Sequence, residues 1–240
     1  MKNNCSLFFL ITIILLGCNM QNDKDSSQNN IDNKINENSD SLFIEKDKDG
    51  KITSKCNYKQ GMQHGLCQFY YNNGQVKEEG NFYFGKPLGT FKYYNEKGNI
   101  EEIREYQIVK DNSVINQILF FDGQGGIIKN KSNYIKLSMQ KDTIQLGKEC
   151  SLNIILEASY FKSNMNVVIG NFDAEYNLID SLGYVKLEGK DFEVQYKFKA
   201  IKIGENVVRG IVKDYKKIYN SDTLQARRNI YFTKKYFVVG

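Results

Sequence analysis

The most reactive side chains of this sequence are five cysteines and a single histidine. A lone histidine cannot form a multi-histidine metal site, and no C-x-x-C pair is present for metal or redox chemistry. His64 lies in the segment Gly61–Gly65, where a turn is expected, and a catalytic histidine would need a nucleophile or carboxylate beside it. We therefore interpret His64 as an exposed turn residue, and we predict no catalytic residue, no metal site and no cofactor.

Cys56 and Cys67 are expected on the two strands of one hairpin. They face each other if Tyr58 pairs with Gly65, and an oxidising compartment would then allow a disulfide. A shift of one residue in register would separate them and leave two free thiols. Cys56 also occupies a position at which the neighbouring repeat units carry glycine or arginine, which argues against a core position. The sequence leaves both alternatives open, whereas Cys150 is expected in a core.

The segment Glu45–Ile52 places acidic side chains at alternate positions before a glycine, as a calcium-binding loop does. The twelfth position of such a loop would be Cys56 instead of a bidentate glutamate, and no flanking helices are expected. We interpret the segment as a charged turn before the first strand.

The N-terminus has the pattern of a targeting segment. A short positive start precedes 11 apolar residues, Ser6–Leu16, which are too few to span a bilayer and typical of a secretory signal. The run ends in Leu-Leu-Gly17-Cys18, which resembles the lipobox of bacterial lipoproteins. That resemblance implies a signal peptide over residues 1–17, cleavage between Gly17 and Cys18, and membrane anchoring through acyl chains on Cys18. A plain secretory signal and a short N-terminal anchor are the alternatives.

Residues 18–45 are rich in Asn, Asp, Ser and Gln and have few large apolar groups. Such a segment cannot bury enough surface to offset its ordering entropy, so we predict a disordered tether. Asn19 follows the cysteine, and an aspartate there would resemble an inner-membrane retention signal. We therefore expect an outer-membrane anchor, with an inner-membrane anchor facing the periplasm as the alternative.

A 24-residue period organises residues 46–130. Gly50, Gly74 and Gly98 are 24 residues apart, and apolar positions follow the same step. The glycines supply positive φ angles for tight turns, and one short unit cannot bury its apolar face alone. A third, looser unit extends to about residue 126. The region therefore predicts a hairpin meander of about six strands, two per unit.

At these positions the chain resembles the MORN repeat family, in the bacterial variant labelled antitoxin-like. The residues that carry the resemblance are Asn57-Tyr58, Gly61, Gly65 and Asn73-Gly74, then Asn81-Phe82, Gly85 and Gly89. It implies a repeat scaffold used for contacts with proteins or with the envelope. Tyr70 and Tyr94, expected as exposed aromatics of the two units, are our candidate binding residues.

Residues 131–240 lose the 24-residue step and show short alternating runs instead. Cys150–Glu157 and Phe192–Lys199 alternate apolar and polar side chains, and further runs bring the expected number of strands to seven or eight. The spacing favours a β-sandwich, and the segments 142–149 and 203–210 resemble immunoglobulin-like modules of envelope proteins. The inter-sheet cysteine pair and core tryptophan of antibody domains are missing.

The sequence thus predicts an all-β protein, a MORN-like meander followed by an immunoglobulin-like sandwich. The net charge of +5 is spread along the chain without a basic stripe, which argues against nucleic-acid binding. We expect a non-catalytic outer-membrane lipoprotein that binds an envelope protein or polysaccharide, with the oligomeric state undecided. An antitoxin or immunity-like partner and a carbohydrate-active hydrolase, which would need two carboxylates in one cleft, are the alternatives.

Overall fold

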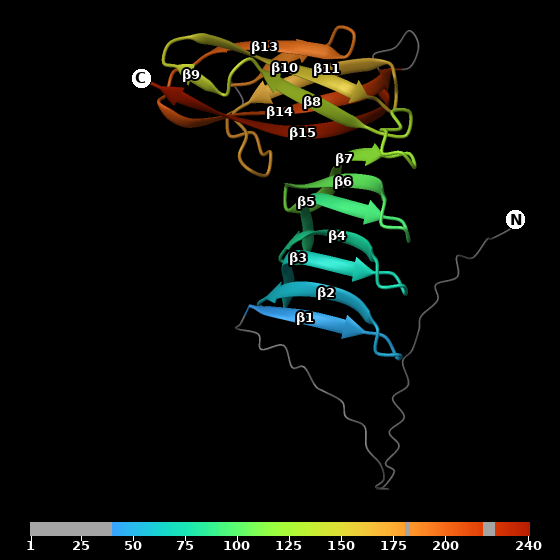
Figure 1. Ribbon diagram of the computed structural model, residues 1–240. Helices are drawn as coiled ribbons and strands as arrows, with labels where there is room; N and C mark the ends of the chain where they lie inside the picture. The colour runs from blue at the N-terminus through green and yellow to red at the C-terminus, as the bar shows by residue number, and fades with distance from the viewer. Residues whose placement is uncertain (1–39, 181–182, 218–223) are drawn as a thin grey trace, which may run out of the picture. The chain divides into compact units, whose positions relative to one another are not determined.

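Every regular element that the computed structural model describes is a β-strand (Figure 1). It describes residues 40–180, 183–217 and 224–240. The predicted signal peptide, Gly17, Cys18 and most of the predicted tether therefore lie outside the described residues. The described strands form one sheet of seven strands and two further sheets of three and five strands.

In the seven-stranded sheet, which we call the repeat sheet, the spatial order follows the chain order and neighbouring strands are antiparallel. Figure 1 shows these strands as a ladder of hairpins. They are β1 (Ser41–Lys46), β2 (Ile52–Lys59), β3 (Met62–Tyr70), β4 (Val76–Tyr83), β5 (Lys86–Tyr94), β6 (Ile100–Val109) and β7 (Asn112–Phe120). The predicted hairpin meander is confirmed, with seven strands instead of six.

The additional strand is β1, which corrects the prediction that the tether extends to residue 45. The β1 backbone pairs with β2 along its whole length, and the Phe43 ring centroid lies 5.8 Å from that of Tyr58. Phe43 precedes Cys67 by 24 residues, so β1 occupies the place of the second strand of an earlier unit. The sequence pattern did not reveal this strand, because polar residues precede it and do not complete a repeat unit with it.

The same five-residue turn follows β1, β3, β5 and β7. The first amide donates to the fifth carbonyl, and the amide of a glycine at the fourth position donates to the first carbonyl. These glycines have φ between +78° and +84°, a region that glycine enters without a steric penalty. The turns span residues 47–51, 71–75, 95–99 and 122–126. The last turn confirms the looser third unit, whose first strand β6 has ten residues against eight in β4.

One face of the repeat sheet, the aromatic face, buries the ring of Phe91. This ring lies 5.3 Å from Phe82 and 4.9 Å from Tyr106, measured between centroids, and both contacts are edge-to-face. Gly80 provides the space for it, because a Cβ atom there would overlap the Phe91 ring. In the second unit, which is the hairpin of β4 and β5, one large side chain therefore packs against a residue that has no side chain.

The chain after the repeat sheet forms two sheets that share one hydrophobic core. The three-stranded sheet has the order β13-β10-β8, and the five-stranded sheet has the order β12-β11-β14-β15-β9, in which only β9 and β15 are parallel among the described pairs. The strands are β8 (Tyr134–Met139), β9 (Thr143–Gln145), β10 (Glu149–Ala158), β11 (Asn164–Gly170), β12 (Val185–Glu188), β13 (Glu193–Lys199), β14 (Gly204–Lys217) and β15 (Leu224–Val239). The eight strands agree with the predicted seven or eight.

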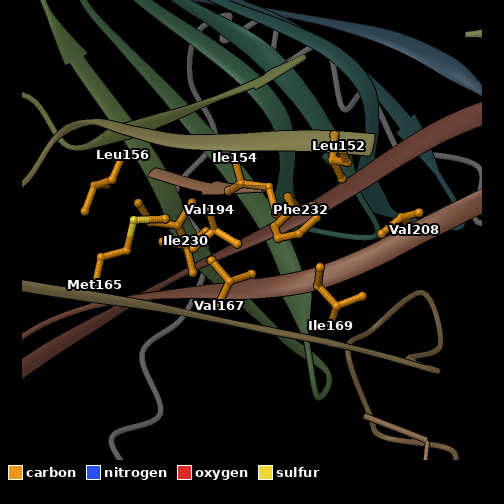
Figure 2. Packing of buried hydrophobic residues seen from close by; sticks show 11 residues of the cluster. Leu152, Ile154, Leu156, Met165, Val167, Ile169, Val194, Val208, Ile230 and Phe232 are labelled. Carbon is orange, nitrogen blue, oxygen red and sulfur yellow. The ribbon is translucent and has the colours of Figure 1, made fainter. Parts of the chain in front are cut away.

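Figure 2 shows the core between these sheets, with side chains of β10 facing those of β11 and β15. Leu152, Ile154 and Leu156 are buried on β10, as their alternation predicts. Cys150 continues this face but is only half-buried, in a smaller cluster with Ile144 and Val238. Burial raises the pKa of the Cys150 thiol, so its thiolate form is disfavoured.

A fully buried asparagine joins the last repeat strand to the sandwich. Asn116 Nδ2 donates to the carbonyl of Tyr231 at 2.8 Å, and the amide of Tyr231 donates to Asn116 Oδ1 at 2.7 Å. The Asn116 side chain thereby forms with the backbone of Tyr231 the two hydrogen bonds that a neighbouring strand would form with β15. The Arg228 guanidinium adds bonds to the carbonyls of Ile115 and Asn116, at 3.1 and 3.3 Å.

The close approach of Gly80 and Phe91 generates the first prediction. Gly80→Ala should lower the free energy of unfolding by about 1–3 kcal/mol, because the new methyl group overpacks the ring. Gly123→Ala is the matched control, since no atom lies within 4 Å of the position that its new methyl group would take. Urea denaturation followed by circular dichroism measures both variants. Equal midpoints for the two would contradict the packing argument.

Candidate binding site on the repeat sheet

The face of the repeat sheet opposite the aromatic face, which we call the polar face, gathers charged and tyrosine side chains from β2 to β5. Strand register places Lys55 opposite Gln68, Gln68 opposite Glu79, and Glu79 opposite Lys92. Alternation along each strand brings further members to the same side. The side chains that form the row are Lys55, Gln68, Tyr70, Glu79, Lys92 and Tyr94.

In the second unit, the Glu79 carboxylate accepts hydrogen bonds from three donors. The Tyr94 hydroxyl donates at 2.7 Å, Gln68 Nε2 at 3.2 Å and Lys92 Nζ at 3.3 Å. These bonds, that from Tyr94 first, hold the pKa of the Glu79 carboxyl below its ordinary value. Burial, and then the Glu79 carboxylate, raise the pKa of Tyr94 to about 12. The cluster therefore stays a carboxylate bound by a neutral phenol across the physiological pH range.

Tyr70 and Tyr94 are half-buried, which corrects the expectation that they are exposed. The Tyr70 hydroxyl donates to Gln68 Oε1 at 3.0 Å, and Lys55 Nζ lies 5.6 Å from the centroid of its ring. Both tyrosines thus have polar partners on their own or the adjoining strand. Sequence alternation assigned their face correctly but gave no information on what covers them.

Tyr70 lines a shallow depression of about 510 Å³ at the turn end of the first unit. Lys51 and Lys55 also line it, together with Ile52, and none of the described residues that line it is acidic. Lys51 Nζ is placed by a 3.4 Å bond to the carbonyl of Asn72. An aromatic ring, an apolar side chain and two ammonium groups around one open space suit an acidic group on a partly apolar ligand. We call this depression the first-unit pocket.

The second unit does not repeat this chemistry. The positions 24 residues after Lys51 and Lys55 carry Gln75 and Glu79. There the Tyr94 hydroxyl already donates a hydrogen bond to the Glu79 carboxylate, as described above. The first-unit pocket therefore differs from its repeat neighbour in charge and in having no carboxylate to bind its tyrosine.

Cys56 and Cys67 lie directly opposite each other, and the structure joins their sulfur atoms in a disulfide. An irregularity between Cys56 and Tyr58 pairs Tyr58 with Gln63 instead of Gly65, so the register differs from the one considered. Both cysteines are buried, which corrects the expectation that Cys56 is outside the core. The pair fills the place that Gly80 and Phe91 fill one unit later.

His64 was expected as an exposed turn residue, and this is wrong. It belongs to β3 and is half-buried, with its ring centroid 4.6 Å from Phe84 and 5.4 Å from Tyr83. Its Nδ1 atom is buried and has no hydrogen-bond partner in the part of the chain that the structure describes. The turn is shorter than expected, because Gln60 and Gly61 alone connect β2 to β3.

The calcium-loop pattern of residues 45–52 is a turn between β1 and β2. Asp47 Oδ1 accepts from the amides of Asp49 and Lys51, each at 2.9 Å. Within residues 40–180, 183–217 and 224–240, no group of three or more His, Cys, Asp or Glu side chains is placed to hold a metal ion. The same described ranges contain no helix that is long and apolar enough to cross a membrane.

Sequence reasoning missed one cluster of basic residues. Lys186, Lys213, Lys217 and Arg227 line a depression on the sandwich, although they are distant in sequence. The available signal was the even spacing of Lys213 and Lys217, which are four residues apart on β14 and therefore lie on one face of the strand. Only the pairing of β14 with its neighbouring strands brings the others to them.

Comparison with known proteins supports the repeat assignment. A model of the MORN repeat variant family matches residues 63–82 and 87–107, which cover most of β3 to β6. The two matches begin 24 residues apart, in agreement with the period of the turns. No curated protein and no solved structure gives a significant match to the chain.

The Glu79 cluster generates a pH prediction. Because the folded-state pKa of Glu79 is depressed, its stabilisation is complete above the unfolded value, near 4.5, and is lost as the pH falls through the folded pKa. Glu79→Gln should lower the free energy of unfolding at pH 7 by about 1–2 kcal/mol. The difference from the wild type should shrink below pH 4.5. Urea denaturation between pH 3 and 7 tests this.

Glu96→Gln is the control for that series. Glu96 is exposed, and its side chain makes no hydrogen bond to any residue that the structure describes. Its stability curve should run parallel to that of the wild type. If the Glu79→Gln curve is also parallel, the hydrogen bonds to Glu79 do not contribute to stability.

Proposed function

We propose that this chain is a non-catalytic, lipid-anchored protein of the bacterial envelope whose repeat sheet binds an acidic segment of a partner protein. The observation that carries the binding role is the first-unit pocket, with Lys51, Lys55 and Tyr70 around one depression. The match of the neighbouring strands to a repeat family supports a scaffold function.

The support for the anchor is in the sequence. An 11-residue apolar run ending in Gly17-Cys18, followed by a polar segment, is the arrangement in which the cysteine becomes the lipidated first residue. Several acyl chains give stable membrane attachment, at about 0.8 kcal/mol per buried CH₂ group. With Asn19 after the cysteine, we assign the outer membrane as the location.

The pocket chemistry supports an acidic protein segment as the ligand. A carboxylate placed between Lys51 and Lys55 would make charge-assisted hydrogen bonds, which are stronger than neutral ones. Tyr70 and Ile52 offer apolar surface to the residues beside that carboxylate. Tyrosine is among the residues enriched in binding hot spots, because its ring contributes contact area and its hydroxyl a polar contact.

We infer further that the C-terminal sandwich is an immunoglobulin-like module that acts as a spacer or second binding unit. The strand orders support this inference: β13-β10-β8 is the order expected for strands E, B and A of that fold, and β11-β14-β15 is the order expected for C, F and G. The core needs neither the cysteine pair nor the tryptophan of antibody domains, because aliphatic side chains together with Met165 and Phe232 fill it.

The anchor is tested by replacing the lipidated residue. Cys18→Ala should abolish incorporation of a labelled fatty acid and release the protein from washed membranes, because no thiol remains at the lipobox position to carry the diacylglycerol. Cys150→Ala is the control and should remain labelled and membrane-bound. A Cys18→Ala protein that stays in the membrane fraction as completely as the wild type contradicts the anchor.

The pocket is tested by reversing one of its charges. Lys55→Glu gives the first unit the residue that the second unit has at this position, and it should weaken capture of cross-linked partners tenfold or more, about 1.4 kcal/mol. Lys97→Glu makes the same charge change on an exposed turn and should leave capture unchanged. Quantitative mass spectrometry of pull-downs from native membranes measures both. Unchanged partners with Lys55→Glu would show that the pocket is not the binding site.

A further inference from the structure

The five-stranded sheet has a second face, turned away from the core, on which polar residues from four strands align. Strand pairing places Glu188 opposite Asn166 and Asn166 opposite Lys213. In the next row, Tyr215 lies opposite Arg227. These residues come from β12, β11, β14 and β15, so the sheet itself holds them in fixed relative positions.

Between them lies an open depression of about 430 Å³. This volume falls within the range of about 300–1,000 Å³ that is typical of small-ligand pockets. Asn166 and Tyr215 are almost fully buried beneath it, whereas Lys186 and Arg227 are exposed at its rim. The depression therefore has a polar floor and a charged rim.

The rim carries an excess of positive charge. Lys186 Nζ is paired with Glu188 at 3.0 Å, but neither Lys213 nor Arg227 forms an ion pair with any residue in the described ranges. Two cations with no carboxylate partner, on adjoining strands and around one depression, favour an anionic ligand. Arginine also presents a planar fork that binds carboxylate or phosphate through two hydrogen bonds.

The floor provides a second, independent indication of a ligand. Asn166 is 6% exposed, and its Oδ1 atom is buried without a hydrogen-bond partner among the described residues. A buried polar atom without a partner costs about 1–3 kcal/mol, and such atoms are rare in native structures. Because Oδ1 can only accept a hydrogen bond, any partner that it takes must be a donor such as a hydroxyl group.

We propose that this depression binds a sugar unit that carries a carboxylate or phosphate group. Arg227 and Lys213 hold the anionic group, and Asn166 Oδ1 accepts a hydrogen bond from a sugar hydroxyl. A fully ionised inorganic anion lacks that hydroxyl donor, and a neutral sugar lacks the anionic group. This site is separate from the first-unit pocket, so the proposal does not depend on the function proposed for the repeat sheet.

Isothermal titration calorimetry on the full chain in detergent tests the proposal. The ligands are glucuronate, glucose 6-phosphate, glucose and inorganic sulfate. Glucuronate and glucose 6-phosphate should bind at least tenfold more tightly than glucose or inorganic sulfate. Equal affinity for glucose, or for inorganic sulfate, would overturn the proposal.

Two variants separate the roles of the charges and of the amide. The double variant Lys213→Gln/Arg227→Gln should weaken glucuronate binding at least tenfold. Asn166→Leu should remove the preference for glucuronate over inorganic sulfate and should raise the thermal midpoint, because it replaces an unpaired buried carbonyl by an apolar group of similar size. Lys235→Gln, remote and paired with Glu205 at 3.1 Å, is the control and should bind as the wild type does.

The double variant changes no fully buried residue, so it keeps the test decisive even if Asn166→Leu fails to fold. Unchanged glucuronate affinity in the double variant would overturn the proposal. Vesicles of phosphatidylglycerol in phosphatidylcholine provide the last arm. If the isolated headgroup, glycerol 3-phosphate, binds more tightly than glucuronate and vesicle binding depends on Lys213 and Arg227, the ligand is a lipid and the assignment to a sugar is wrong.

Discussion

The absence of a side chain at Gly80 is the constraint on which the repeat sheet depends. The ring of Phe91 occupies the space that a Cβ atom would fill, and Phe82 and Tyr106 close around it. One unit earlier the same place holds Cys56 and Cys67, joined to each other. Consecutive units thus fill the same place in the sheet with different side chains, while the turns that follow their second strands keep one backbone geometry.

This division between a regular backbone and variable side chains explains where specific chemistry arises. The polar face keeps its tyrosine at residues 70 and 94, but the residue beside it changes from Lys55 to Glu79. In one unit the tyrosine is bound by a carboxylate, and in the other an ammonium group lies over its ring. Two differences on a constant scaffold, Lys51 against Gln75 and Lys55 against Glu79, therefore distinguish an open basic pocket from a closed polar cluster. In the sandwich, by comparison, the charged depression depends on four strands at once.

The sequence predicted the features that repeat or alternate. The 24-residue step predicted the turns and the order of the hairpins, and alternation predicted the buried face of β10. It failed where pairing between strands decides the outcome. β1 was missed because it has only half a unit around it, the register of Cys56 depends on a local irregularity, and the partners of Tyr94 lie on other strands. The unpaired oxygen of Asn166 depends on burial beneath its neighbours, which no single strand encodes.

The order of the repeat sheet also has a mechanical consequence. Because spatial order equals chain order and β1 is at the edge, tension applied before residue 40 acts on β1 before it reaches any other strand. Detaching its six residues would release about 20 Å of extended chain from the sheet, at about 3.3 Å per residue. Peeling then meets the Cys56–Cys67 bond, which ties β2 to β3 covalently. The first strand would thus detach under load while the rest of the sheet stays folded.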